Sequence, residues 1–117
     1  MKTWITQLRK GLLEFCILNV ISCGETYGYE LVQRLNRAEQ LAASESTIYP
    51  ILTRLKREGY VKVRTAPSSG GPPRRYFSLT TVGRYRIREM NTYWDEVCGA
   101  VTGLRDTTQR RSDNEDR

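Results

Sequence analysis

The side chains best suited to binding chemistry in this chain are cationic, and they lie in its middle. Arg74 and Arg75 directly precede the aromatic pair Tyr76 and Phe77, and they follow a segment rich in serine, glycine and proline at residues 65–73. A guanidinium group presents a fork of N–H donors that fits the oxygens of a phosphate. We therefore predict that Arg74 and Arg75 bind phosphate; the alternative is that they form a solvated strand face.

The distribution of charge along the chain says more than its total of +6. Residues 45–88 carry ten basic side chains and two acidic ones, whereas residues 89–104 carry three acids and no base. An excess of one sign in one block makes a local patch, and a basic patch attracts polyanions such as nucleic acid. The alternative is a charged face that only keeps the protein dissolved.

A helix predicted over residues 44–59 carries the second group of candidate side chains. Ile48, Leu52 and Leu55, together with Ile51, recur at the spacing of one buried helical face. Pro50 is tolerated if Ser46 caps the helix and Pro50 lies within about the first turn. The polar side chains predicted at the helix start and on its outer side are Ser46, Thr47, Tyr49, Thr53, Arg54 and Arg57. In the alternative, Tyr49 packs on the helix surface and Thr47 is a second capping hydroxyl.

Further elements must position these residues. A helix over residues 4–21 is apolar on two sides, which predicts a core face and an interface. A second helix over residues 27–38 is expected to begin at Thr26 as its cap. Residues 60–64 and 75–79 alternate apolar and polar side chains, so we predict two strands joined by a flexible tip of nine residues, 65–73.

A last helix, capped by Thr80, carries a heptad pattern of apolar residues. The spacings of three and four residues along this seam predict a contact between two copies of the helix, and an intramolecular core is the alternative. The seam consists of Ile87, Met90, Trp94, Val97, Val101 and Leu104. Almost nothing after Leu104 is apolar, which predicts a disordered tail.

The predicted order is helix, helix, helix, strand, strand, helix. This is a mainly α (α+β) fold with the layout of a winged helix-turn-helix domain. We assign residues 1–79 to that domain, residues 80–104 to a dimerisation helix and residues 105–117 to the disordered tail.

Several classes of function lack the residues that they need. The chain has three cysteines, no histidine and no Cys-x-x-Cys spacing, so neither a metal site nor a cofactor is predicted. No nucleophile stands beside a plausible base, which argues against an enzyme. Cys16 and Cys23 are too far apart on one helix to form a disulfide, although pairing of Cys98 between subunits stays open. Residues 12–23 form neither a signal peptide nor a membrane span, and the predicted location is the reducing cytoplasm.

The function that fits these elements is binding to double-stranded DNA. A helix fits the major groove, where Ser46, Thr47, Tyr49 and Thr53 would reach base edges, while the tip at residues 65–73 would lie along the neighbouring backbone or in the minor groove. Because these side chains are short or planar, specificity is expected to rest partly on DNA shape. In the alternative, the same basic face binds another regulator or an acidic protein.

Short motifs along residues 12–83 resemble the successive signatures of the PadR family of bacterial transcriptional regulators. They are Gly28-Tyr-Glu-Leu31, Thr47-Ile-Tyr-Pro50, Arg54-Leu55, Glu58-Gly59, Gly70-Gly71, Arg74-Arg-Tyr76, Leu79-Thr80 and Gly83. Lys56 departs from the pattern, because the family more usually has an acid there. The short final part with one tryptophan-bearing helix resembles the small-protein subgroup that includes the lactococcal multidrug-binding repressor.

The resemblance implies a homodimer that represses a nearby gene until a ligand relieves it. The last helix would pair with the first and last helices of the mate, which adds Leu8 and Leu12 to the predicted interface. Tyr27 and Tyr76, within or beside the family motifs, join the predicted DNA contacts. Trp94 matches a tryptophan that stacks planar aromatic drugs at the dimer centre, and the other predicted effector residues are Phe15, Met90, Tyr93 and Val97. The alternative is that Trp94 only fills the dimer core.

Overall fold

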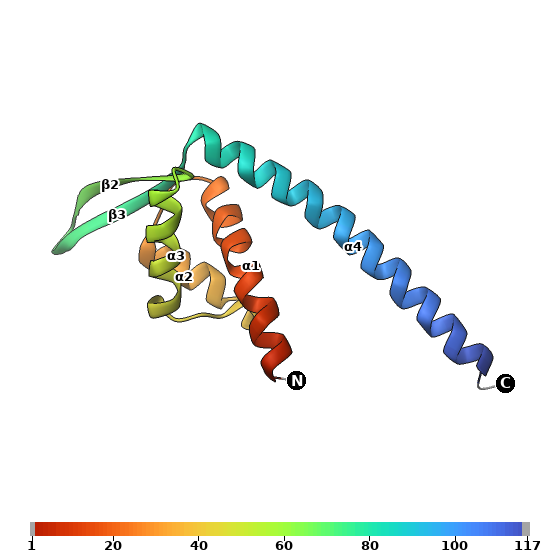
Figure 1. Cartoon of the computed structure of the whole chain (residues 1–117). Coiled ribbons are helices and arrows are strands. Elements are labelled where there is room, and N and C mark those ends of the chain that lie inside the picture. The colour runs from red at the N-terminus through yellow and green to blue at the C-terminus, as the bar shows by residue number, and fades with distance from the viewer. Residues whose placement is uncertain (1, 116–117) are drawn as a thin grey trace. The chain divides into compact units, whose positions relative to one another are not determined.

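The computed structural model describes the backbone of residues 2–115 and the side chains of residues 2–107 (Figure 1). Its elements in chain order are α1 (Lys2–Ser22), β1 (Thr26–Tyr27), α2 (Gly28–Asn36), the 3₁₀ turn η1 (Glu39–Leu41), α3 (Glu45–Arg57), β2 (Val61–Ser68), β3 (Gly71–Leu79) and α4 (Thr81–Glu115). The predicted order of helices and strands is confirmed, with one short extra strand, β1. The described residues divide into two compact units between Ile87 and Arg88.

The core of the first unit lies between three helices and one face of the sheet. The buried apolar side chains are Leu13, Ile17, Leu18 and Ile21 of α1, Leu31, Val32 and Leu35 of α2, Ile48, Leu52 and Leu55 of α3, Val61, Phe77 and Leu79 of the hairpin, and Ile87. Burial of one such side chain contributes roughly 1.5–3 kcal/mol, so these contacts fix the helices that carry the candidate site.

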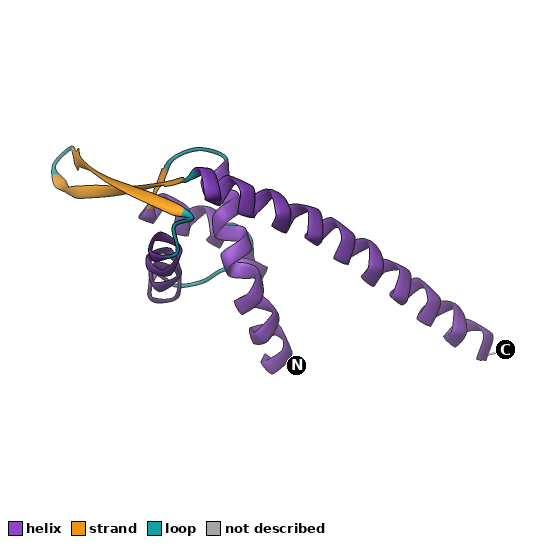
Figure 2. Cartoon of the chain, turned by 45° about the horizontal axis from the view of Figure 1, so that its top comes forward, coloured by secondary structure: helices purple, strands orange, loops and turns teal. Residues whose placement is uncertain are grey.

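The hairpin of β2 and β3 differs from its prediction, because its strands run almost to the tip. The pairing extends from Val61 opposite Leu79 to Ser68 opposite Gly71, and a two-residue turn, Ser69-Gly70, joins the strands. Gly70 has a φ of +73°, a conformation that glycine adopts without strain. The predicted flexible tip of nine residues is therefore wrong, and the hairpin extends as an ordered ribbon away from α1, α2 and α3 (Figures 1 and 2).

Three prolines are accommodated in this ribbon by two features of the sheet. The strand order is β1-β3-β2, and β1 pairs with β3 only at Phe77 and Tyr76, so one edge of β3 is open at Pro72 and Pro73. The register shifts between Ala66 and Ser68, which leaves Pro67 at an irregularity of β2. Proline is tolerated at open edges and bulges because it has no N–H to give to the ladder.

The starts of α2 and α3 lie elsewhere than the sequence predicts. Thr26 does not cap α2: it is a buried strand residue whose Oγ1 donates a hydrogen bond to Glu30 Oε1 at 2.9 Å, and Tyr27 precedes the helix. α3 is preceded by Ser44 rather than capped by Ser46. Pro50 is then the sixth residue of α3, beyond the first turn, so the helix lacks the N–H that would bond the carbonyl of Ser46.

The first turn of α4 is fixed to the loop between α3 and β2. Thr80 is the predicted cap: the backbone N–H of Gly83 donates to Thr80 Oγ1 at 3.0 Å, and Thr80 Oγ1 donates to the carbonyl of Gly59 at 2.6 Å. A Cβ atom at Gly83 would collide with the carbonyl oxygen of Tyr60. Only glycine therefore allows this close approach.

α4 continues to Glu115, through most of the segment that was predicted to be disordered. Asp116 and Arg117, the end of the predicted tail, lie outside the described residues. Within residues 2–115, no helix is both long and apolar enough to span a membrane.

Candidate nucleic-acid interface

One exposed stripe runs along the side of α3 opposite its buried residues. Ser46, Pro50, Thr53 and Arg57 follow at steps of four, three and four residues, and all four side chains are exposed. Thr53 Oγ1 donates to the carbonyl of Tyr49 at 3.0 Å, so its hydroxyl is held against the helix. This α3 stripe brings together three of the predicted contact residues, and Pro50 is a member that the sequence prediction missed.

A group of hydroxyls lies at the amino end of α3. Ser44 Oγ is 2.8 Å from Ser46 Oγ and 3.3 Å from Thr47 Oγ1, and all three side chains are exposed. Hydroxyls and the positive end of a helix dipole both suit a phosphate, although the acid Glu45 in the first turn opposes it. Ser44 was not predicted as a contact. Its position just before the apolar pattern of α3 is the feature of the sequence that could have indicated it.

Tyr49 lies between the helices and the hairpin rather than on the exposed stripe. Its ring packs over Gly28, where any Cβ atom would collide with the phenol oxygen. Burial raises the pKa of Tyr49, the charge of Glu45 raises it further, and Arg75 lowers it. The packed alternative for Tyr49 is thus the geometry observed, and the neutral phenol stays available as a hydrogen-bond donor.

A groove of about 430 Å³ opens beside Tyr49 and runs along the hairpin, from Phe77 toward its root to Ser69 at its turn. Tyr29 and Tyr49 line its helical side, and the hairpin side includes Ser68, Arg74 and Arg75. We call it the wing-root groove. Its tyrosine hydroxyls and guanidinium groups are donors for phosphate oxygens, and Tyr29, whose side chain is 55% exposed, was not predicted as a contact.

Arg74 and Arg75 rest on different aromatic rings. The Arg75 guanidinium lies 5.6 Å from the ring centroid of Phe77, while that of Arg74 lies 4.4 Å from the ring of Tyr27. Successive residues of a strand point to opposite faces, which separates the two guanidiniums. The two arginines therefore border the groove without forming one joint phosphate clamp.

The predicted contacts Tyr27 and Tyr76 belong to a stacked row across the sheet. Tyr27 stands opposite Tyr76 in the register, and their ring centroids are 5.7 Å apart in an edge-to-face arrangement. Arg64 covers the ring of Tyr76 at 4.6 Å, as Arg74 covers that of Tyr27. These rings are occupied by arginines, so they are less available to DNA than the sequence implies.

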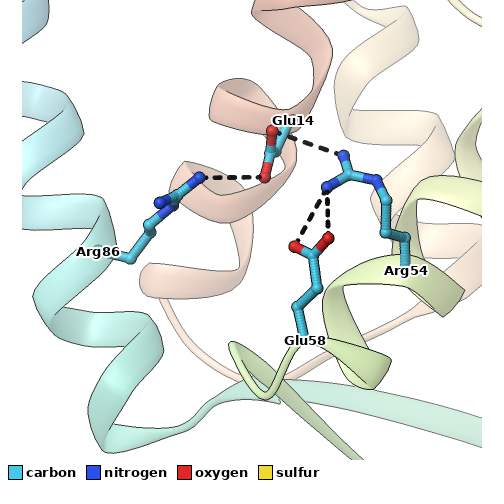
Figure 3. Close-up of polar contacts among 4 residues, drawn as sticks. All are labelled: Glu14, Arg54, Glu58 and Arg86. Atoms are coloured by element: carbon cyan, nitrogen blue, oxygen red, sulfur yellow. Dashed lines mark hydrogen bonds and ion pairs between the residues drawn. The ribbon is translucent and has the colours of Figure 1, made fainter.

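Arg54, another predicted DNA contact, lies off the α3 stripe and is held by two carboxylates of the same chain (Figure 3). Its Nη2 lies 3.5 Å from Glu14 Oε2 of α1, and its Nη1 lies 3.2 Å from Glu58 Oε2. The contact with Glu14 is the largest cause of the raised pKa of Arg54. Because intramolecular carboxylates already neutralise this guanidinium, it adds little to the positive face.

A model of a known protein family matches the segment that holds the α3 stripe, the wing-root groove and the hairpin. It is described as the transcriptional regulator PadR-like family, and it matches residues 17–89, more than half of the chain. This chain belongs to the PadR-like family.

Solved structures of bacterial transcriptional regulators resemble most of the fold. A Streptococcus transcriptional regulator is 40% identical with a TM-score of 0.76, covering 85% of this chain and 97% of that one. A PadR-like regulator from Bacillus cereus is also 40% identical with a TM-score of 0.76, covering 84% and 95%. Bacillus subtilis PadR, solved in complex with operator DNA, is 26% identical with a TM-score of 0.63 over 68% of this chain and 46% of its own length.

The predicted dimer residues of this PadR-like chain differ in exposure. Ile87 is only 5% exposed and belongs to the core of the first unit, which corrects its place in the seam. Leu8 and Val101 are close to half exposed, and Leu104 is 69% exposed. The remaining predicted residues, Leu12, Met90 and Val97, are half-buried, and Trp94 is 40% exposed.

The predicted effector residues of the PadR-like protein come from two helices. Phe15 lies on α1 and is half-buried. The other four, Met90, Tyr93, Trp94 and Val97, lie on α4, where the ring of Tyr93 is 67% exposed. Among the residues whose side chains are described, no group of three or more histidine, cysteine or acidic residues is placed to hold a metal ion.

Proposed function

We propose that this PadR-like regulator binds operator DNA as a homodimer and represses transcription of a nearby gene. In each subunit, α3 would enter the major groove with its exposed stripe. The hairpin would follow the adjacent backbone. The observation that carries this proposal is the wing-root groove, which places cationic and hydroxyl donors beside Tyr49 in the second turn of α3.

The contacts divide into two kinds. Arg57 at the far end of the α3 stripe and Arg75 in the wing-root groove would bind phosphates, which supplies affinity without reading sequence. Ser46, Thr47 and Thr53 would face base edges. Hydroxyls this short discriminate weakly between bases, so DNA shape would carry part of the specificity.

The exposed apolar residues of α1 and α4 support the homodimer. Trp4, Ile5 and Leu8 are exposed near the amino end of α1, as are Val101 and Leu104 on α4. Large apolar side chains grouped in this way are usually covered by a partner. A symmetric pair presents two recognition helices, and its operator would have half-sites about 34 Å, one DNA turn, apart.

A planar aromatic effector would relieve repression, as in the small-protein subgroup that the chain resembles. Trp94 supports this part of the proposal, because its ring lies partly exposed on the seam of α4. An aromatic ring in such a position stacks on a planar ligand. We place the regulator in the cytoplasm, where it would need no cofactor.

Salt dependence of duplex binding tests the proposal. Log affinity should fall with log salt with a slope of about −0.9 per phosphate contacted, and Arg57→Ala or Arg75→Ala should each reduce that slope by about one contact. Arg34→Ala is the matched control, because Arg34 is exposed on α2 and borders neither the stripe nor the groove. An unchanged slope in both variants, or tight binding only to an acidic protein, would show that the basic face has another role.

A further inference from the structure

An acidic residue is attached to the basic hairpin. Glu25 immediately precedes β1, and its carboxylate accepts two hydrogen bonds from Arg64 of β2, from Nε at 2.8 Å and from Nη2 at 2.6 Å. This is the two-point geometry in which an arginine and a carboxylate hold each other's orientation. The hydrogen bond lowers the pKa of Glu25 and raises that of Arg64.

Arg64 links this carboxylate to the stacked row of the sheet. Tyr27 of β1, Tyr76 of β3 and Arg64 of β2 stand opposite one another across the three strands. Arg64 covers the ring of Tyr76 at 4.6 Å, and Arg74 closes the other end of the row over Tyr27 at 4.4 Å. We call these four residues with Glu25 the wing brace.

The wing brace lies where the hairpin joins the helices, so it can set the angle of the hairpin. A two-stranded ribbon is marginal by itself, and β1 adds only two residues of pairing to β3. The ribbon extends away from the helices, so a small rotation at its root moves the tip far (Figure 2). Glu25 ties β2 to the segment that leads into α2, where Gly28 and Tyr29 line the wing-root groove.

We propose that Glu25 is a positioning residue for DNA binding, which acts through Arg64 to hold the hairpin at the angle that the operator requires. The inference rests on the proposed function of the chain. Its consequence runs against simple electrostatics. Loss of a negative charge should strengthen binding to a polyanion, whereas loss of the brace should weaken binding to the operator.

The two effects separate on two kinds of DNA. Glu25→Gln removes the charge and frees the Arg64 guanidinium, which should raise affinity for any duplex. The operator requires the hairpin and α3 to engage together, so its affinity should fall. We expect a drop of about two- to fivefold, the range of an exposed ion pair. The ratio of operator affinity to affinity for other duplexes should therefore decrease, because the first falls while the second rises.

The experiment uses a duplex selected by the wild-type protein from random-sequence DNA and a scrambled duplex of equal length. Glu25→Gln should bind the selected duplex more weakly and the scrambled one at least as tightly as the wild type. Glu39→Gln is the matched control, since Glu39 is an exposed acid of η1 outside the brace, and it should not weaken binding to either duplex.

Two more variants separate positioning from folding. Arg64→Lys keeps the charge but loses the fork and the flat stacking group, so it should reproduce the defect on the selected duplex. The double variant Glu25→Arg, Arg64→Glu rebuilds the ion pair at unchanged net charge and should recover at least part of the lost affinity. Recovery would not occur if Arg64 acted by binding a phosphate directly, because position 64 would then carry an acid.

The outcomes of this experiment distinguish the two proposals. If the wild type selects no duplex, the proposed function itself fails. If the wild type selects a duplex and Glu25→Gln or Arg64→Lys binds it as tightly or more tightly, the regulator role stands and the wing brace is wrong. If Glu25→Gln does not fold, Arg64→Lys and the double variant decide the question.

Discussion

At the scale of single residues, Trp94 carries the proposed response to a small molecule. Its ring lies on the α4 seam and is 40% exposed. Residues 89–104 carry three acids and no base, so a planar cation suits this segment better than a planar anion. The resemblance to the small-protein subgroup implied this role for Trp94, and in the structure the ring is partly exposed.

Proflavine, a planar aromatic cation, tests this response. In a Trp4→Phe protein, Trp94 is the remaining tryptophan of the two, and its emission should be quenched with saturation at the proflavine concentrations that release DNA. Trp94→Ile should bind DNA without being released by proflavine, because the stacking surface is lost. Release of DNA from Trp94→Ile at the same concentrations would show that proflavine acts elsewhere, at another site of the protein or on the duplex itself.

The elements of the fold were predictable to different degrees. The apolar patterns of α1, α3 and α4 require only local spacing, and they indicated these helices. β1 has only two residues, too few to show an alternating pattern. The sequence therefore predicts Thr26 as a helix cap, whereas in the structure it pairs with Phe77. The prolines and glycines of residues 65–73 predicted a loop. Composition alone does not reveal that one edge of β3 is open, and an open edge tolerates proline.

The candidate site shows the same division. Charge counts located the basic block without any geometry, and the hydroxyls at the start of α3 followed from the helix. The contact of Arg54 with Glu14 and that of Arg64 with Glu25 join segments distant in the sequence, so neither could be read from local pattern. Both contacts change the role of an arginine that charge counts treat as free.

Glu14 joins three helices through one carboxylate. It contacts Arg54 of α3 at 3.5 Å and Arg86 in the first turns of α4 at 3.9 Å (Figure 3). Its Oε1 is buried without a hydrogen bond, which indicates an ion pair held by charge rather than by close geometry. We expect Glu14→Gln to lower the free energy of unfolding by about 1–2 kcal/mol, because Arg54 and Arg86 then lose the carboxylate that they share.

Thermal unfolding at fixed protein concentration measures this effect. The midpoint should fall by roughly 4–8 °C per kcal/mol for a domain of this size. Glu58→Gln is the matched control: Glu58 directly follows α3, pairs with Arg54 one turn earlier and is 39% exposed, so its loss should cost about 0.5 kcal/mol. Equal effects of the two variants would contradict a special role for Glu14.

At the scale of the whole molecule, the apolar seam of α4 predicts its assembly. We expect Val101→Asp to shift the protein toward monomers, since a buried unpaired carboxylate at the centre of a symmetric contact occurs twice. Sedimentation velocity would report the change. Thr102→Asp is the control, because it places the same charge beside the seam.

The same variant links assembly to DNA. A monomer would engage one half-site only, and the affinity for a two-site duplex should fall by at least tenfold while binding to a single half-site changes little. A Val101→Asp protein that remains dimeric would place the subunit contact elsewhere.

The prolines of β3 have a consequence for how the molecule behaves when it is crowded. An unpaired strand edge invites the edge of another molecule, and ribbons built in this way end in insoluble assemblies. Pro72 and Pro73 offer no N–H to an incoming strand, and the adjoining Arg74 and Arg75 repel an identical hairpin. The hairpin therefore keeps an exposed edge for a nucleic acid without pairing with the hairpin of another copy.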